Sequence, residues 1–265
     1  MRRSVSAEMS KVKIAFLSAL LPCFLSIAIQ VPPAVAQTAN LVPSRSSSVS
    51  VRELSIPSGA RDEFERGLRN LLKRDPVASV RHFDAAIKKF PGYYEAYYHE
   101  GVAKLELGHD AEAMQVFQTA IDLSSGRYAR AEFGYALVLC RQGNPAEAER
   151  IARRGLEVDP GIPDGYVVLG LALLHLNHLD ESERAARQAL LLKRPGAAKA
   201  YLVLADVHAA KKQYEAQVQD LTQYLRQFPD DPKKDRVKSE RDMAARLAKR
   251  SAAGPQGSGE AIAAN

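Results

Sequence analysis

The spacing of prolines constrains the fold of this chain more than any other feature. The segments "KKFPG", "EVDPG" and "RQFPD" place Pro91, Pro160 and Pro229 at two equal intervals of 69 residues. Each interval is one residue more than two units of 34. A period of this length is typical of solenoids, in which each unit packs only on its neighbours. Five units can be placed, with single-residue insertions at Tyr128 and Ala197: 60–93, 94–127, 129–162, 163–196 and 198–231.

Small and large residues recur at fixed positions of these units. Position 8 carries Gly67, Gly101, Ala136, Gly170 and Ala205. Position 24 carries Phe83, Phe117, Ala152, Ala186 and Leu221. A tiny side chain on one helix lets a second helix approach closely, and a larger side chain on that helix fills the space between them. Each unit is therefore predicted to be a pair of antiparallel helices, which makes the chain all-α.

The turn between the two helices of a unit is marked at position 15. Gly108, Gly143 and Asn177 stand there, and these residue types tolerate a positive φ. A proline near position 32 then ends the second helix. The first unit has Arg-Asp-Pro at 74–76 where a glycine is expected. Its first helix is therefore expected to be frayed or atypical.

This pattern resembles the tetratricopeptide repeat (TPR) family over residues 60–231. The unit 163–196 has these residues on motif positions: Tyr166, Leu169, Gly170, Ser182, Ala186 and Ala189. The resemblance implies a right-handed superhelical solenoid of about five helix-turn-helix pairs. Position 7 is usually apolar in the family, but it is Arg66 in the first unit and Glu100 in the second.

The N-terminal residues 1–36 are predicted to be a signal peptide. Basic residues precede an apolar run at 14–31, and Ala-Val-Ala at 34–36 is the pattern that signal peptidase recognises. The protein is therefore expected to be exported, as a periplasmic or secreted protein with no membrane attachment after cleavage. Because the run is about 18 residues long, its retention as a membrane anchor remains an alternative.

The segments that flank the repeats differ from them in composition. Residues 37–59 are rich in Ser and Pro and are predicted to be a disordered or extended lead-in. Residues 232–250 are highly charged with a sparse apolar stripe, which favours a capping helix on the last repeat. The stripe consists of Val237, Met243 and Leu247. Residues 251–265 are small and are predicted to be a disordered tail.

The charge and the cysteines of the chain exclude two classes of protein. Without residues 1–36 the chain has 33 Lys and Arg against 30 Asp and Glu. This weak positive charge, with no basic run interleaved with aromatics, argues against a nucleic-acid partner. Only Cys140 remains after cleavage, so no internal disulfide is possible. We interpret Cys140 as a small buried hydrophobic residue.

No arrangement of residues indicates catalysis or a bound metal. The chain lacks the nucleophile, zinc-protease and phosphate-loop motifs, and its six histidines scatter over four repeats. His175 and His178 are three apart, but Asn177 between them marks a turn, so they need not share a helix face. The protein is therefore expected to be no enzyme, with no cofactor and no metal site.

The TPR resemblance implies a concave groove lined by the first helix of each unit. Its ligand-contacting positions 5 and 9 correspond to Phe64, Leu68, Tyr98, Val102, Phe133, Leu137, Val167, Leu171, Leu202 and Asp206. This wall is mostly apolar, and it lacks the Lys and Asn of TPRs that clamp carboxylates. The expected partner is therefore an apolar helix or peptide of another protein, and the expected function is a non-catalytic interaction scaffold or adaptor in the cell envelope.

Three alternatives remain open at this stage. The apolar side chains could pack among themselves, or residues 37–59 could lie in the groove. The protein could also be a structural one whose repeats stack into homo-oligomers.

Overall fold

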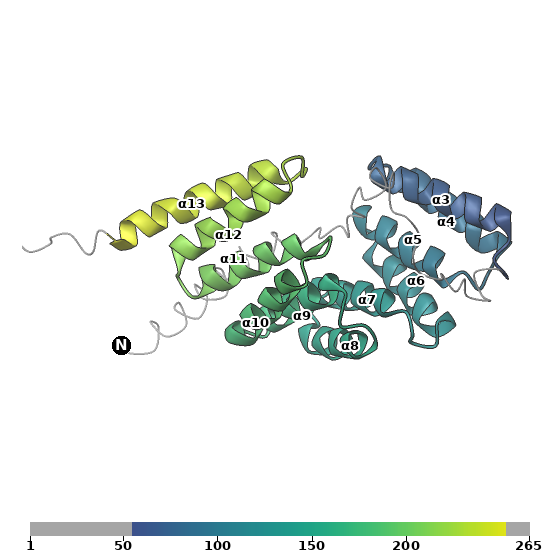
Figure 1. Ribbon diagram of the computed structural model, residues 1–265, viewed down its shortest axis with the longest axis horizontal. Helices are drawn as coiled ribbons and strands as arrows, with labels where there is room; N and C mark the ends of the chain where they lie inside the picture. Colours follow the sequence, from purple (N-terminus) through teal and green to yellow (C-terminus); the bar gives the residue numbers. More distant parts are fainter. Residues whose placement is uncertain (1–54, 253–265) are drawn as a thin grey trace, which may run out of the picture. The chain divides into compact units, whose positions relative to one another are not determined.

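The computed structural model describes residues 55–252 (Figure 1). The predicted signal peptide, most of the predicted lead-in and nearly all of the tail lie outside the described residues. Every regular element in the described part is helical, so the predicted all-α class is confirmed. No helix among these residues combines the length and the apolar character needed to cross a bilayer.

The helices fall into two compact units that divide between Asn144 and Pro145, inside the third repeat. The first unit contains α3 (Ser58–Leu72), α4 (Pro76–Lys89), α5 (Tyr94–Glu106), α6 (Asp110–Leu123) and α7 (Ala129–Arg141). The second contains α8 (Pro145–Val158), α9 (Pro163–His175), α10 (Leu179–Leu191), the 3-10 turn η2 (Ala197–Lys199), α11 (Ala200–Ala210), α12 (Tyr214–Gln227) and α13 (Lys234–Ala252). Within each unit, helices that are consecutive in the chain pack on one another.

The turn inside each repeat has the same backbone geometry. Position 15 takes a positive φ in every repeat, at Arg74, Gly108, Gly143, Asn177 and Lys212. The next N–H then donates to a carbonyl five residues back, as from His109 to Lys104 at 2.9 Å. This bond satisfies a carbonyl that the helix end leaves without a partner.

The first helix of the first repeat is not frayed, contrary to the expectation from residues 74–76. Helix α3 runs for 15 residues, and Arg74 takes the left-handed conformation with φ of 59°. Asp75 then caps the next helix, because its side chain accepts a hydrogen bond of 2.9 Å from the N–H of Ala78. Pro76 follows at the first helical position, where its missing N–H costs nothing.

Close approach of the two helices depends on the predicted pairing of small and large residues. A Cβ atom on Gly67 would lie 2.5 Å from the ring of Phe83. Phe117 lies against two glycines, because a Cβ on Gly101 or on Gly134 would come within 2.6 Å of its ring. Both phenylalanines are fully buried. Backbone-to-ring contact of this kind leaves no space for even a methyl group.

The two polar residues at position 7 have different surroundings. Arg66 is exposed and pairs with Glu63 at 3.1 Å. Glu100 is buried and lies 3.3 Å from Lys104, which also contacts Glu112 at 2.6 Å. Each departure from the family pattern is accompanied by an ion pair, at an exposed position for Arg66 and at a buried one for Glu100.

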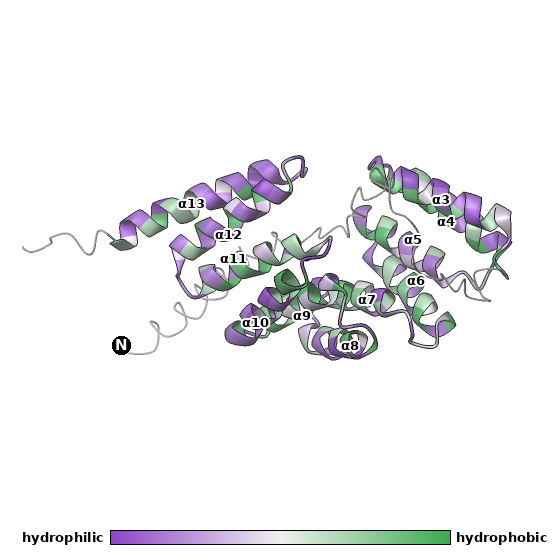
Figure 2. Ribbon diagram, viewed as in Figure 1, coloured by the Kyte–Doolittle hydropathy of each residue, from purple (hydrophilic) through white to green (hydrophobic). Residues whose placement is uncertain are grey.

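The predicted capping helix is present as α13, which packs on α12. Its buried residues are Val237, Ala244 and Ala248. The expected stripe is therefore wrong at two positions, since Met243 is 58% and Leu247 is 37% exposed. Figure 2 shows that hydrophilic residues dominate this helix. Alanines form its contact face because a small side chain lets two helices approach closely.

Candidate functional site

The first helices of the repeats bury most of the predicted groove residues. Six of the ten are at most 2% exposed: Tyr98, Val102, Phe133, Leu137, Val167 and Leu171. The other four are partly exposed: Phe64, Leu68, Leu202 and Asp206. The accessible part of the predicted wall is therefore confined to α3 in the first unit and α11 in the second.

Aromatic packing accounts for the burial in the first unit. The ring of Tyr98 on α5 lies 5.9 Å from that of Phe117 and 5.5 Å from that of Tyr128, centroid to centroid. Tyr128 in turn lies 5.1 Å from Tyr94. Rings at these separations attract each other beyond their area of contact. Bulky side chains at position 5 thus fill the space that smaller or polar ones would leave open.

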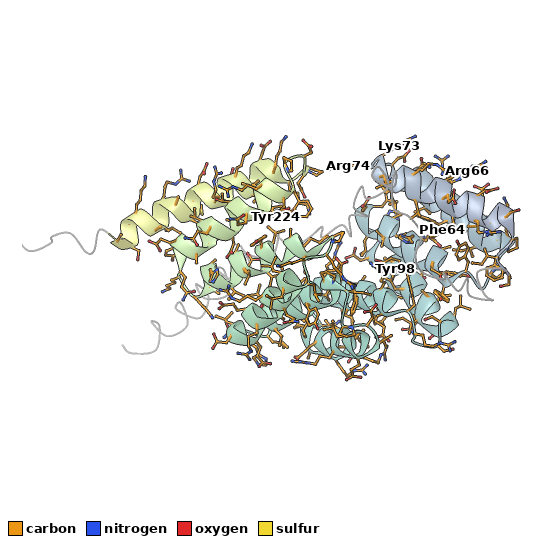
Figure 3. The ribbon with its side chains drawn as sticks, in the orientation of Figure 1. Phe64, Arg66, Lys73, Arg74, Tyr98 and Tyr224 are labelled. Atoms are coloured by element: carbon orange, nitrogen blue, oxygen red, sulfur yellow. The ribbon has the colours of Figure 1, made fainter. Side chains whose placement is uncertain are left out.

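Helix α3 keeps an apolar stripe that is partly accessible. Phe64, Leu68 and Leu72 are spaced by four residues and therefore lie along one side of the helix. Leu72 is 42% exposed, and the other two are half-buried. We call these three residues the α3 stripe. Figure 3 shows Phe64 on this helix and Tyr98 on the neighbouring α5.

Phe64, the N-terminal residue of the α3 stripe, is held in place because aromatic rings surround it. Its ring centroid is 4.9 Å from that of Tyr93, 5.4 Å from that of His99 and 5.7 Å from that of Phe83. Ile56, from the predicted lead-in, is buried in the adjoining cluster with Ala60 and Tyr93. The sequence alone did not single out Leu72, although its spacing from Leu68 carries the signal.

His99 behaves as an apolar residue in this aromatic cluster. Its ring stacks on Phe83 at 5.8 Å and meets Tyr98 edge-on at 4.8 Å. The Nδ1 atom is shielded from solvent and has no hydrogen-bond partner among the described residues. Burial, helped by the nearby positive charge of Arg130, lowers the pKa of His99 to about 3. The imidazole is therefore neutral at ordinary pH.

In the second unit, the two accessible wall residues lie beside the cap. Burial first, and then the negative charge of Glu240, raise the pKa of Asp206 well above its usual value, while Arg236 opposes the shift. Glu240 and Arg236 both belong to α13. Asp206 is thus in electrostatic contact with the capping helix, and Leu202 packs against the cluster of Leu221, Tyr224 and Val237.

Ion pairs connect α10 to the C-terminal end of α11 in the second unit. Glu183 on α10 lies 2.8 Å from Lys211 and 2.7 Å from Arg187. Hydrogen bonds from these two cations lower the pKa of Glu183 to about 2. Nearby, the Nδ1 atom of His208 on α11 lies 2.6 Å from a carboxylate oxygen of Asp220 on α12. Glu183, Lys211 and Arg187 are each matched with an opposite charge, which is the arrangement of a structural network.

The remaining residues with reactive side chains are separated from one another. Helix α9 ends at His175, Asn177 has φ of 62°, and His178 precedes α10, so a turn separates the two histidines as predicted. Cys140 is buried, and burial raises the pKa of its thiol to about 12. In residues 55–252 no three metal-binding side chains come together.

Comparison with known proteins agrees with this architecture. A sequence model of the tetratricopeptide repeat matches residues 64–128, 133–190 and 167–232. No curated protein matches the chain in sequence. A thermophilic TPR protein from Thermus thermophilus, TTC0263, superposes with a TM-score of 0.61 at 20% identity, covering 70% of this chain and 98% of that one.

Two further solved structures share the fold at low identity. The type IV pilus biogenesis factor PilW has a TM-score of 0.57 at 15% identity, over 76% of this chain and 96% of its own. The APC/C hetero-tetramer Cut9–Hcn1 has a TM-score of 0.64 at 17% identity, over 72% of this chain and 37% of the other. Together, the repeated turn, the glycine–phenylalanine packing and the matched residues show that the chain belongs to the tetratricopeptide repeat family.

Proposed function

We propose that this protein is a non-catalytic interaction scaffold or adaptor of the cell envelope, which holds an apolar peptide or helix of another protein against the first helices of its repeats. The observation that carries the proposal is the α3 stripe. It is an apolar surface of a folded domain that stays partly open to solvent although neighbouring wall residues are buried. Such surfaces on soluble proteins commonly mark partner sites.

The geometry of the stripe suits a helical or extended apolar ligand. Phe64, Leu68 and Leu72 present side chains at one-turn intervals, and ligand anchors at matching intervals would fit between them. The ring cluster beneath Phe64 holds it in place, so little side-chain entropy is lost on binding. Covering one such side chain contributes on the order of 1 kcal/mol.

The envelope location in this proposal depends on residues 1–36. Their basic start, apolar run and Ala-Val-Ala site support export. Fractionation of cells that produce the full chain tests this step by itself. A mature protein in the periplasm or medium, with its N-terminus at Gln37, is the expected result. Retention of unprocessed chain in the cytoplasm would refute the envelope part and leave the binding part standing.

Site-specific photo-cross-linking tests the binding surface. A photo-reactive phenylalanine analogue replaces Leu68 in the α3 stripe, or Arg81 on the exposed side of α4 in the same repeat. We expect a discrete cross-linked protein from position 68 and none from position 81. The cross-linked peptide, identified by mass spectrometry, should be an apolar segment.

A second substitution shows whether the contact is apolar. Leu72→Glu adds a charge at an exposed site and should abolish the cross-link from position 68 while leaving the helical circular dichroism unchanged. A cross-link from position 81 alone, or one from position 68 that is insensitive to Leu72→Glu, would overturn the assignment of the ligand to the α3 stripe.

A further inference from the structure

The capping helix carries the excess positive charge of the described protein. Helix α13 has seven Lys and Arg against three Asp and Glu. The other described residues are almost balanced, with 24 Lys and Arg against 25 Asp and Glu. A charge excess concentrated on one exposed helix favours an acidic partner.

Within the described residues, the ion pairs of this helix lie in its first half and none lies in its last two turns. In the first half, Lys238 pairs with Asp235 at 3.4 Å and Arg241 with Asp242 at 2.7 Å. In the last two turns, Arg246, Lys249 and Arg250 are exposed and have no ion pair within residues 55–252. Their positive charge is therefore available to a ligand.

Exposed apolar residues lie on the same side as two of these cations. Met243, Arg246, Leu247 and Arg250 follow the spacing i, i+3, i+4 and i+7, which places them on one helix face. Lys249 lies on another face. Cations near a helix C-terminus also stabilise the helix itself. That effect does not account for Met243 and Leu247, which are 58% and 37% exposed beside them.

We propose that these four residues, which we call the cap surface, bind an acidic amphipathic helix of a partner protein. Met243 and Leu247, one turn apart, would meet apolar residues of that helix, and Arg246 and Arg250 would pair with its carboxylates. The inference is independent of the ligand proposed for the α3 stripe, which lies in the other unit.

The packing of α13 favours a protein partner over a lipid surface. Helices that lie in the membrane interface insert a continuous apolar face. The apolar face of α13, with Val237, Ala244 and Ala248, is already buried within its own unit. The two apolar residues that remain suit the short anchors of a helix ligand.

Binding of defined probes to the mature chain tests the proposal. The probe is a fluorescein-labelled helical peptide with three repeats of Glu-Leu-Glu-Glu-Leu-Ala-Glu, and its counterpart has Lys in place of every Glu. We expect the acidic peptide to bind and the basic one not to bind. Arg246→Gln with Arg250→Gln should weaken binding at least about fivefold, and Met243→Ser with Leu247→Ser should weaken it by a similar factor.

The matched control removes the same charge from other faces of the same helix. Lys238→Gln with Lys249→Gln should leave the affinity within about twofold of the unmodified chain. Circular dichroism and melting verify that each variant is folded. Equal losses in both charge variants, or no loss in the serine variant, would mean non-specific attraction and would overturn the proposal.

Two other occupants are separate outcomes of the same experiment. The first probe is a vesicle of phosphatidylcholine with about a third phosphatidylglycerol. If the chain binds these vesicles more tightly than it binds the acidic peptide, the cap surface is assigned to lipid. Self-association without peptide that disappears in the Arg246→Gln, Arg250→Gln variant would assign it to a second copy. Either result would overturn the assignment to an acidic helix.

Discussion

At the scale of single residues, backbone strain is concentrated in the turn of each repeat. The hydrogen bonds that close the turn require a left-handed residue at position 15, whatever its side chain. Glycine adopts that conformation without cost, whereas other L-residues are strained by about 1 kcal/mol. Arg74 and Lys212 occupy it with φ of 59° and 58°. The sequence indicated this turn only in the repeats with Gly or Asn at position 15. The hydrogen bonds impose the positive φ in the other repeats too, where the residue type gives no sign of it.

Exchanging glycine into and out of this position should change stability in opposite directions. Lys212→Gly removes the strain and should raise the free energy of unfolding by about 0.5–1 kcal/mol. Gly108→Ala introduces the strain and should lower it by about 1 kcal/mol, although the new methyl group would touch nothing within 4 Å. Urea denaturation of both variants measures the two changes.

Lys212→Ala serves as the control, because alanine keeps the strain and loses only the charged side chain. It should leave the free energy of unfolding nearly unchanged. If the alanine variant gains as much as the glycine variant, the side chain rather than the backbone determines stability at this position.

His99 should make the stability of the protein depend on pH. The pKa of a histidine is about 6.5 in an unfolded chain, and that of His99 in the folded protein is about 3. Between these values the unfolded chain binds a proton that folded His99 does not. Stability is therefore lost as pH falls below about 6.5, by on the order of 1 kcal/mol per pH unit from this residue.

Urea denaturation between neutral pH and pH 5 measures this dependence. His99→Phe removes the titrating group and keeps an aromatic ring in the cluster, so its stability should fall less steeply with acid. His178→Gln, at an exposed turn position, is the control and should follow the unmodified protein. Parallel curves for all three proteins would show that His99 is not the group responsible.

At the scale of helices, the repeat register predicted where a residue lies and which residue it contacts better than it predicted how exposed that residue is. Gly67 with Phe83 and Gly101 with Phe117 pack as their positions implied, because both residues of a pair belong to one repeat. The accessibility of the predicted groove depends instead on how closely successive first helices approach. Tyr98 and Phe64 both contact rings from outside their own helices, yet Tyr98 is buried and Phe64 on α3 stays partly exposed.

The capping helix shows the same limit of sequence reasoning. The charge and the sparse apolar pattern of the sequence predicted that this helix exists, but they did not predict which of its residues contact the last repeat. Met243 and Leu247 are larger and more apolar than Ala244 and Ala248, yet the alanines are buried. The contact selects for small volume, which a hydrophobicity pattern does not express.

At the scale of the whole molecule, charge distinguishes a monomeric scaffold from a stacking protein. Helix α3 and the residue after it expose Arg66, Arg69 and Lys73. The last helix, α13, exposes Arg246 and Arg250. Arg66 and Arg69 pair with Glu63 and Glu65 within α3. Stacking of α3 of one copy on α13 of another would therefore bring Lys73 close to Arg246 and Arg250, and these like charges repel each other.

We therefore expect the mature chain to be a monomer in solution. Light scattering over a wide range of concentrations at low salt, where the repulsion is not screened, should give the mass of one chain. If charge repulsion alone kept copies apart, screening by salt would allow them to associate. A mass that rises with concentration at low salt would contradict the expectation, and it would favour a structural protein that assembles through its repeats over a scaffold that waits for a different partner.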